Sequence, residues 1–263
     1  MVLTVLTGDL RFVFVAPMFS ASSTLGQMLA SIVAQSYTNW RLILIDDVSP
    51  SDELIKEKEI ISRFQAIVDP ALVEGKIDVI WNDEKKWETR NVLEGIKLCN
   101  DDDIVCRLDA DDWLTDTDAL AMLAGIYGRH EQIDCVWSAH RWGFSDRNIS
   151  GPLPPAANVY AHPWVTSHLK TFRKRLINGI PYENFTNQEG HLVKRAGDQA
   201  LYLPVLHNAR VKFFLNKVLY HYTIDEQGGA VYQTDDARYQ KAEADFIRAR
   251  GYVSQGKPWE ESL

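Results

Sequence analysis

Residues 41–51 read Arg-Leu-Ile-Leu-Ile-Asp-Asp-Val-Ser-Pro-Ser, and this stretch is the clearest single indication of the fold class. Its first five residues form a β-rich apolar run, which predicts a strand. The acidic pair Asp46–Asp47 follows directly, and the Ser and Pro residues after it are turn formers. Carboxylates are therefore expected at the C-terminal end of a strand.

The segments on either side repeat an order of strand, loop and helix. Residues 12–16 are apolar and end at Pro17, and helical spacing of apolar residues begins at Thr24, with Ser22 or Ser23 as the expected cap. Further elements are expected as a helix from 52, a strand at 77–81, a helix at 91–98, a strand at 104–108, a helix at 118–127 and a strand at 135–137. This alternation predicts an α/β fold with a mixed, mostly parallel central sheet flanked by helices.

The later part of the chain is less regular. A Pro-rich stretch at 152–163 is interpreted as the seam that leads into a second half of the same domain. After it we expect a helix that begins near Asp198, two β-like runs at 211–215 and 218–223, and a polar closing helix at 236–250.

Composition narrows the class of protein. A formal net charge of −8 over 263 residues argues against a protein whose main task is to coat nucleic acid, because phosphate binding relies on clustered Lys and Arg. The one basic cluster runs from Lys170 to Arg175. It is either a solvated face or a surface that contacts a phosphate or an acceptor.

The cysteines and the apolar runs indicate a compartment. Cys99, Cys106 and Cys135 form no C-x-x-C pair and leave one thiol over, so neither a disulfide framework nor a zinc knuckle is expected. No run approaches the ~20 apolar residues that a membrane helix requires, and no signal peptide is evident. We expect a soluble, intracellular protein of the cytoplasm without a transmembrane segment.

The sharpest chemical signal is Leu108-Asp-Ala-Asp-Asp-Trp113, in which three carboxylates follow an apolar strand. Carboxylates this close raise one another's pKa unless a cation neutralises them, and a hard ion with oxygen ligands, Mn²⁺ or Mg²⁺, fits best. Loop solvation or helix capping is the alternative for an isolated D-x-D. Because ligands bind at the carboxyl ends of strands in open α/β sheets, Pro17, Asp47 and Asp109 are expected to meet in one crevice.

Five stretches together resemble the family 2 glycosyltransferases of the GT-A (Rossmann-like) fold in order and spacing. They are Val15-Ala-Pro-Met-Phe, Ser31-Ile-Val-Ala-Gln-Ser-Tyr, Ile45-Asp-Asp-Val-Ser, Thr89-Arg-Asn and Leu108-Asp-Ala-Asp-Asp. The resemblance covers residues 12–115 well, and Lys170-Thr-Phe-Arg-Lys and Ala196-Gly-Asp-Gln-Ala-Leu are similar to two later landmarks of that family. It implies an inverting, metal-dependent hexosyl- or pentosyltransferase with a nucleotide-sugar-binding half at 1–115 and an acceptor-binding half at 116–263.

The resemblance also implies roles for single residues. Pro17 and Phe19 are similar to the loop beside the donor's base, and Asp47 to the carboxylate that accepts a hydrogen bond from that base, commonly uracil, which makes a UDP-sugar the expected donor. Arg90 resembles a further donor-site residue. Asp109 and Asp111 match the carboxylates that hold the ribose and the metal-diphosphate, while Asp112 orients the turn. The alternatives are that Phe19 is a packed aromatic and that Arg90 pairs with a surface acid.

Asp198 matches the position of the general base in inverting members. An acceptor hydroxyl is a poor nucleophile until a carboxylate removes its proton, which explains why the chemistry needs such a group. The alternative is a helix N-cap, because Asp is a favoured capping residue and an apolar helical run follows.

The chain departs from the family's pattern at three places. Ser20 stands where an Asn commonly follows the first loop's aromatic residue, and Gly197 replaces the acidic residue often found before the base. Gly228-Gly229 suggests a loop that closes over the diphosphate. His221 is either a further metal ligand or a structural residue.

Two other classes of function compete. A sugar-phosphate nucleotidyltransferase uses a related architecture, but its Gly-rich phosphate loop has no counterpart in residues 17–23. A non-catalytic nucleotide- or carbohydrate-binding module could keep the fold without the reaction. The acceptor stays open among glycans, lipid-linked sugars, protein side chains and a hydroxylated DNA base.

Overall fold

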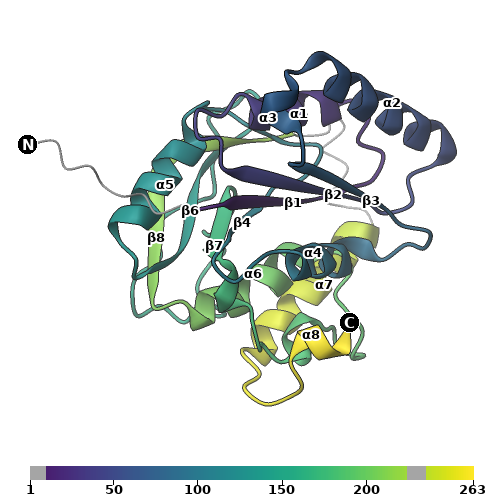
Figure 1. The fold of residues 1–263 in the computed structure, drawn as a ribbon. Coiled ribbons are helices and arrows are strands. Elements are labelled where there is room, and N and C mark those ends of the chain that lie inside the picture. Colours follow the sequence, from purple (N-terminus) through teal and green to yellow (C-terminus); the bar gives the residue numbers. More distant parts are fainter. Residues whose placement is uncertain (1–9, 224–234) are drawn as a thin grey trace, which may run out of the picture.

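The computed structural model describes residues 10–223 and 235–263, and these contain one sheet with the strand order β3-β2-β1-β4-β7-β6-β8-β5 (Figure 1). The strands are β1 (Phe12–Met18), β2 (Trp40–Asp46), β3 (Ile77–Trp81), β4 (Ile104–Arg107), β5 (Trp113–Leu114), β6 (Ile133–Trp142), β7 (Lys170–Arg173) and β8 (Val211–Tyr222). Strands β1 to β4 pair in parallel, as do β6 and β8, whereas β7 is antiparallel to both of its neighbours. The predicted mixed, mostly parallel sheet is confirmed.

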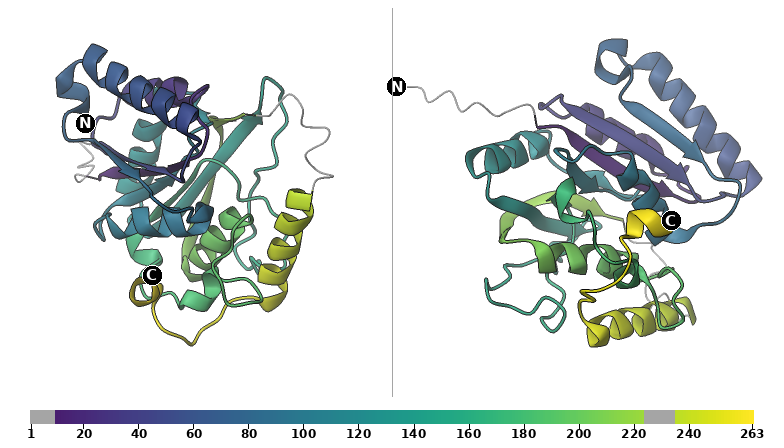
Figure 2. Two further views of the ribbon diagram at one scale, coloured as in Figure 1. Left: turned by 90° about the vertical axis from the view of Figure 1, so that its right-hand side faces the viewer. Right: turned by 60° about the horizontal axis from the view of Figure 1, so that its bottom comes forward.

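Helices cover both faces of the sheet, as the views in Figure 2 show. The helices are α1 (Leu25–Val33), α2 (Ser51–Ile67), α3 (Pro70–Val73), α4 (Trp87–Lys97), α5 (Ala119–Arg129), α6 (Gly197–Asn208), α7 (Asp235–Arg250) and α8 (Trp259–Ser262), with 3₁₀ turns at Lys174–Leu176 and Tyr182–Phe185. Helices α1, α2 and α5 lie on one face, and α4, α6 and α7 lie on the other.

Each face of the sheet has its own apolar core because successive side chains of a strand point to opposite sides. In β1, Phe12 and Phe14 pack with residues of α1 and α5, whereas Val13 and Val15 pack with residues of α4 and α6. All four side chains are fully buried. Burying such a side chain contributes about 1.5–3 kcal/mol, so the two cores together fix the layers.

Gly95 brings α4 close to the sheet. A Cβ atom at this position would lie 2.6 Å from Val15 Cγ1 and 2.9 Å from Ile45 Cδ1, which is closer than such atoms can approach. A larger residue would push the helix away. Because α4 is held this near, its first turn reaches the ends of β1 and β2.

Most of the basic cluster from Lys170 to Arg175 lies in the buried strand β7, which corrects the expectation of a solvated face; Arg175, after the strand, is exposed. Lys170 is 1% exposed and Arg173 is 8% exposed, so the cluster is not a solvated face. Buried charges need partners, and Arg173 donates to the carbonyl oxygens of Ile133 and Tyr127. Lys170 pairs with Asp198 across the structure.

Three element boundaries also differ from expectation. Helix α4 begins at Trp87, four residues before the predicted start, and β8 is one continuous strand where two were expected. Neither Ser22 nor Ser23 caps α1; the Ser22 hydroxyl donates to Glu53 instead, and Thr24 occupies the N-cap position.

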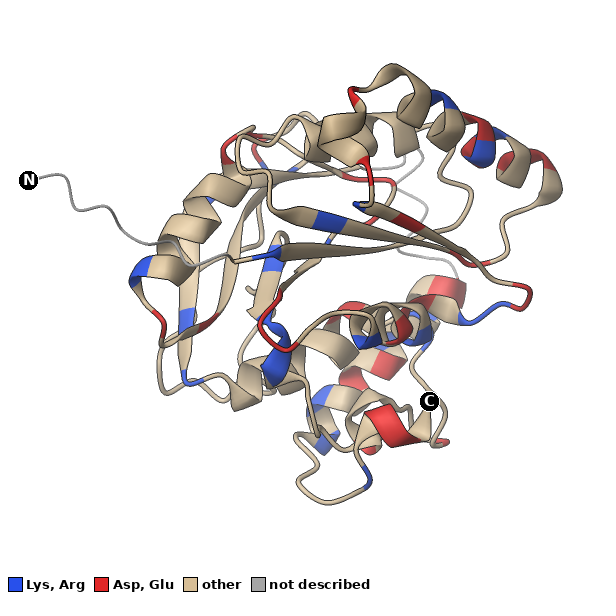
Figure 3. Cartoon of the chain, in the orientation of Figure 1, with Lys and Arg blue, Asp and Glu red and all other residues tan. Residues whose placement is uncertain are grey.

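Charged residues are concentrated on helices α2 and α7, and Figure 3 shows red and blue segments alternating along α2. The strands in the same view are mostly tan. Across residues 10–223 and 235–263, none of the helices has the length and apolar character needed to cross a bilayer.

Candidate functional site

A pocket of about 750 Å³ opens at the carboxyl ends of the parallel strands. The side chains around it are Pro17, Met18, Phe19, Ala21, Asp47, Lys85, Trp87, Glu88, Asn91, Asp109, Ala110, Asp111, Lys194, Arg195, Asp235, Asp236, Ala237 and Gln240. Strands β1, β2 and β4 run in the same direction, so the segments that follow them meet at one edge. Pro17, Asp47 and Asp109 therefore line the same pocket, as the sequence predicts.

One end of the pocket combines an aromatic ring with a fixed carboxylate. Phe19 is half exposed, and Lys85 Nζ lies 3.5 Å from its ring centroid. Asp47 Oδ1 accepts hydrogen bonds from the backbone N–H groups of Lys86, at 2.6 Å, and Trp87, at 3.2 Å. These N–H groups open helix α4, where a negative charge is favoured by the helix dipole. The contacts hold Asp47 in place between β2 and α4.

Three residues beside the pocket adopt the left-handed backbone region that side chains with a Cβ rarely enter. Ser20 has φ 55°, Val48 has φ 64° and Trp87 has φ 63°. Each follows or precedes a residue that lines the pocket. Such conformations cost about 1–3 kcal/mol each and persist where the surroundings enforce them, often at functional sites.

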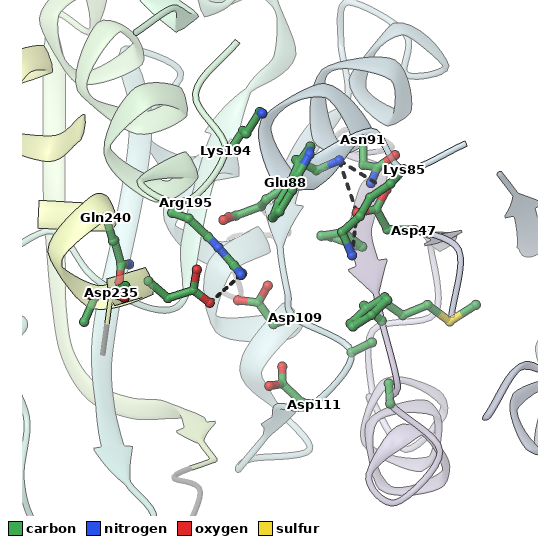
Figure 4. A pocket seen from close by; sticks show the side chains of 18 residues that line it. Asp47, Lys85, Glu88, Asn91, Asp109, Asp111, Lys194, Arg195, Asp235 and Gln240 are labelled. Carbon is green, nitrogen blue, oxygen red and sulfur yellow. Dashed lines mark hydrogen bonds and ion pairs between the residues drawn. The ribbon is translucent and has the colours of Figure 1, made fainter. Parts of the chain in front are cut away.

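Asp109 and Asp111 lie at the centre of the pocket in Figure 4, between the Asp47 and Lys85 side and the Arg195 and Asp235 side. Asp109 Oδ1 accepts a hydrogen bond from Arg107 Nη2 at 2.6 Å. Burial, which disfavours the charged form, and the negative charge of the neighbouring Asp109 raise the pKa of Asp111 to about 6. A cation at this point would relieve the repulsion between the two carboxylates.

The donor set fits a metal ion that arrives with a phosphate ligand. Among the described residues, no group of three or more His, Cys, Asp or Glu side chains is arranged to hold an ion by itself. Mg²⁺ is usually held by one or two carboxylates together with water and substrate phosphates. Asp109 and Asp111 supply two such carboxylates and leave the other positions to the ligand.

Asp112 and His221 both form hydrogen bonds that hold the end of strand β8 in place. Asp112 is buried and accepts hydrogen bonds from Tyr220 Oη and from the backbone N–H of Thr223, both at 2.6 Å. His221 Nδ1 accepts a hydrogen bond from Arg141 at 2.9 Å, and its ring stacks on Trp113. Burial and the nearby Arg141 lower the pKa of His221. The Gly228-Gly229 loop lies outside the described residues.

Asp198 lies in the first turn of α6, in an ion pair. Its Oδ1 is 2.7 Å from Lys170 Nζ, and its Oδ2 is 3.9 Å from His168 Nε2. It lines a second, small cavity together with Lys170 and Arg107 and is not among the residues that line the large pocket. Burial acts to raise the pKa of Asp198, but Lys170, His168 and Arg107 outweigh it and hold that pKa below the usual range.

Glu88 is a pocket residue that sequence reasoning missed. Its Oε1 accepts a hydrogen bond from Arg107 Nη2 at 2.9 Å, the same nitrogen that donates to Asp109. Burial, reinforced by Asp198 and Asp109 against the opposing effect of Arg107, raises the pKa of Glu88 to about 7. The sequence predicts a start of α4 near residue 91, so Glu88 lies before the predicted helix. The glycine at 197, where the family's pattern has an acid, is a signal that could have led to a search for a carboxylate elsewhere.

Arg90 lies apart from this group. Its Nε is 3.0 Å from Glu94 Oε1, its Nη1 is 3.9 Å from Glu84, and it does not line the pocket. The structure thus brings together Pro17, Phe19, Asp47, Asp109 and Asp111, while Arg90 and Asp198 have other partners in this conformation. Lys85, Lys194 and Arg195 are cations of the pocket that no sequence pattern indicated.

A family model described as glycosyl transferase family 2 matches residues 13–186. That match covers β1 to β7 and the Asp109–Asp111 segment. It ends before α6. A search of curated protein sequences found no significant match.

Solved structures share the fold at low sequence identity. S. aureus TarS aligns with a TM-score of 0.62 and 16% identity over 90% of this chain, which spans 43% of the TarS chain. TarS 1–349 in complex with UDP-GlcNAc gives 0.61 and 14% over 90% of this chain and 72% of that one. The mannosyltransferase PcManGT from Pyrobaculum calidifontis, in complex with GDP-Man and Mn²⁺, gives 0.61 and 11% over 93% and 65%. The GT-A fold that the sequence resemblance implied is confirmed.

Proposed function

The chain belongs to glycosyl transferase family 2, and on that premise we propose that it moves a sugar from a nucleotide-sugar donor to an acceptor hydroxyl with inversion at the anomeric carbon. The observation that carries the proposal is the meeting of three carboxylates, Asp47 after β2 and Asp109 and Asp111 after β4, in one pocket with Phe19. The nucleotidyltransferase alternative gains nothing from the family match.

The donor occupies the wall formed by residues 1–115 in this proposal, and residues 116–263 form the acceptor half. Phe19 and Pro17 pack against the base, and Asp47 accepts a hydrogen bond from it. Asp47 has lone pairs beyond those used by the N–H groups of Lys86 and Trp87, so it can accept from a ligand as well. A UDP-sugar is the proposed donor, supported by the likeness to TarS in complex with UDP and UDP-GlcNAc.

Asp109 and Asp111 would hold Mn²⁺ or Mg²⁺. Such an ion, when bound, neutralises negative charge on the diphosphate leaving group. The likeness to PcManGT in complex with Mn²⁺ supports this choice. Arg107, which donates to Asp109 Oδ1, keeps that carboxylate oriented toward the pocket.

The proposed reaction is a single displacement. The acceptor oxygen forms a bond to the anomeric carbon while the bond from that carbon to the diphosphate oxygen breaks, and the diphosphate leaves with the electron pair. Asp198 takes the proton of the hydroxyl. Its lowered pKa keeps it ionised, and the hydroxyl becomes far more acidic as its oxygen attacks. The Asp198 carboxylate must turn from Lys170 toward the pocket to do so.

The acceptor is proposed to be a glycan or another hydroxyl-bearing molecule. A hydroxylated DNA base would need exposed cations to contact the DNA phosphates, and most of the Lys170 to Arg175 cluster is buried, so this acceptor has little support. Cys99, Cys106 and Cys135 are free thiols, which suits a reducing compartment such as the cytoplasm.

Donor hydrolysis with and without MnCl₂ tests the proposal against a non-catalytic binding module. The parent protein should release UDP or GDP from a nucleotide sugar only with the metal, and Asp198→Asn should lower that rate. A binding module would show no metal-dependent turnover in either protein. Retention of the donor's anomeric configuration in a transfer product would contradict the single displacement.

A further inference from the structure

Glu88 lies near two other carboxylates, Asp109 of the large pocket and Asp198 of α6, and both act on its charge. It lies in the first turn of α4, lines the large pocket, and shares the Arg107 Nη2 donor with Asp109. Its side chain is 28% exposed, whereas Arg107 is 5% exposed. The carboxylate thus has one oxygen fixed by a buried guanidinium and a free face toward the pocket.

The start of α6 is shaped around this carboxylate. A Cβ atom at Gly197 would lie 2.6 Å from both Glu88 Cδ and Glu88 Oε2. Only a glycine leaves room for Glu88 beside Asp198. The N-terminal end of a helix also favours a nearby negative charge.

Asp198, by contrast, has its carboxylate engaged. Lys170 Nζ lies 2.7 Å from Oδ1, and the side chain, although 34% exposed, lines a small cavity with Lys170 and Arg107 and not the large pocket. Glu88 is the carboxylate of this pair that an incoming ligand meets in the large pocket. Figure 4 shows it above Asp109, on the side of Arg195.

We propose that Glu88 accepts a hydrogen bond from the attacking hydroxyl group, or from water in its place, and holds that oxygen beside Asp198. This inference rests on the proposed glycosyl transfer. Arg107 fixes Glu88 Oε1, and Oε2, packed against Gly197, is the acceptor. Glu88 thereby supplies from α4 the second carboxylate that Gly197 does not supply from α6.

Water serves as the acceptor in the test, because nucleotide-sugar hydrolysis needs no knowledge of the natural acceptor. UDP-glucose, UDP-GlcNAc and GDP-mannose are offered with MnCl₂, and UDP affinity and the melting temperature are measured in parallel. Glu88→Gln keeps the shape and should lower turnover at least about tenfold, because a positioned carboxylate contributes this much or more. UDP affinity should stay within about twofold, and Glu88→Asp should retain part of the rate. Glu84→Gln, an exposed acid three residues before α4, is the matched control and should behave as the parent.

A double variant that moves the carboxylate from position 88 in α4 to position 197 in α6 distinguishes a role in orienting the acceptor from a role in folding. Glu88→Ala combined with Gly197→Glu should recover at least about tenfold of the turnover that Glu88→Ala loses. If Glu88→Gln turned over at the parental rate, this inference would be overturned, but the proposed function would not. Loss of turnover with an equal loss of UDP affinity and melting temperature would also overturn it, in favour of a purely structural ion pair. A parent protein without metal-dependent turnover or UDP binding would overturn the proposed function and this inference with it.

Discussion

The donor wall of the pocket and the segment around Asp198 hold their acidic side chains in different ways. On the donor wall, Asp109 and Asp111 follow a parallel strand directly and face the pocket. Asp198 does not line the pocket in this conformation: it begins helix α6 and pairs with Lys170, a buried cation from an antiparallel strand. The first arrangement depends on local sequence order, and the second depends on contacts between distant segments. In the proposed function, the donor wall is therefore ready for a ligand, whereas Asp198 and the segment around it, the acceptor wall, have to rearrange.

The largest effect is expected on the donor wall. In the proposed site, Asp109→Asn would remove a charge that faces the diphosphate and the metal, so metal-dependent donor hydrolysis should fall about 10³-fold, as several kcal/mol of lost charge stabilisation would give. Steady-state kinetics with saturating MnCl₂ measure the change. Asp116→Asn is the control, because Asp116 pairs with Lys217 away from the pocket. Equal rates in the two variants would place the metal elsewhere.

The next effect concerns the acceptor wall. Asp198→Asn should lower turnover by about 10²-fold or more, the usual contribution of a general base, and leave UDP affinity within about twofold. Calorimetric titration with UDP separates binding from turnover. Asp101→Asn controls for the loss of an ion pair. It removes the surface partner of Lys174, which follows strand β7 directly. A parallel loss of UDP affinity would make Asp198 part of the donor wall and remove the contrast.

Alanine substitutions at two helical glycines should change the free energy of unfolding in opposite directions. Gly95→Ala in α4 would force its Cβ against Val15 and Ile45, so the free energy of unfolding should fall by about 1–3 kcal/mol. Gly125→Ala in α5 meets no atom within 4 Å. It should raise that free energy by about 0.5–1 kcal/mol, because alanine is the better helix former. Urea denaturation measures both, and equal shifts would show that α4 can move away from the sheet.

The smallest effect is expected at Arg90. Its guanidinium pairs with Glu94 outside the pocket lining and is 40% exposed, so Arg90→Ala should change UDP affinity by less than about twofold. The same calorimetric titration measures it. A tenfold loss would instead bring Arg90 into the donor wall, as the resemblance of its segment to the family implies.

The donor wall could be predicted from sequence because its signals are local. Continuous apolar runs that end in Pro17, Asp47 or Asp109 indicate both a parallel strand and the position of its carboxyl end. The order of these runs places their ends at one edge of the sheet. The family resemblance covers the same residues.

The acceptor wall could not be predicted in this way. Strand β7 carries Lys170 and Arg173 in the middle of the sheet, and the usual meaning of such a run is a solvated surface. These buried cations are stabilised by partners from distant parts of the sequence, such as Asp198 for Lys170. The place of Glu88 likewise follows from an early helix start and from the missing Cβ of a residue more than a hundred positions away.

Titration of UDP into the protein, with and without MnCl₂, tests whether the two carboxylates bind a metal together with the donor. We predict binding that strengthens strongly with the metal in the parent and loses this dependence in Asp111→Asn, because in the proposed site Asp109 and Asp111 together hold the ion. Metal-independent binding of equal strength in both proteins would contradict it.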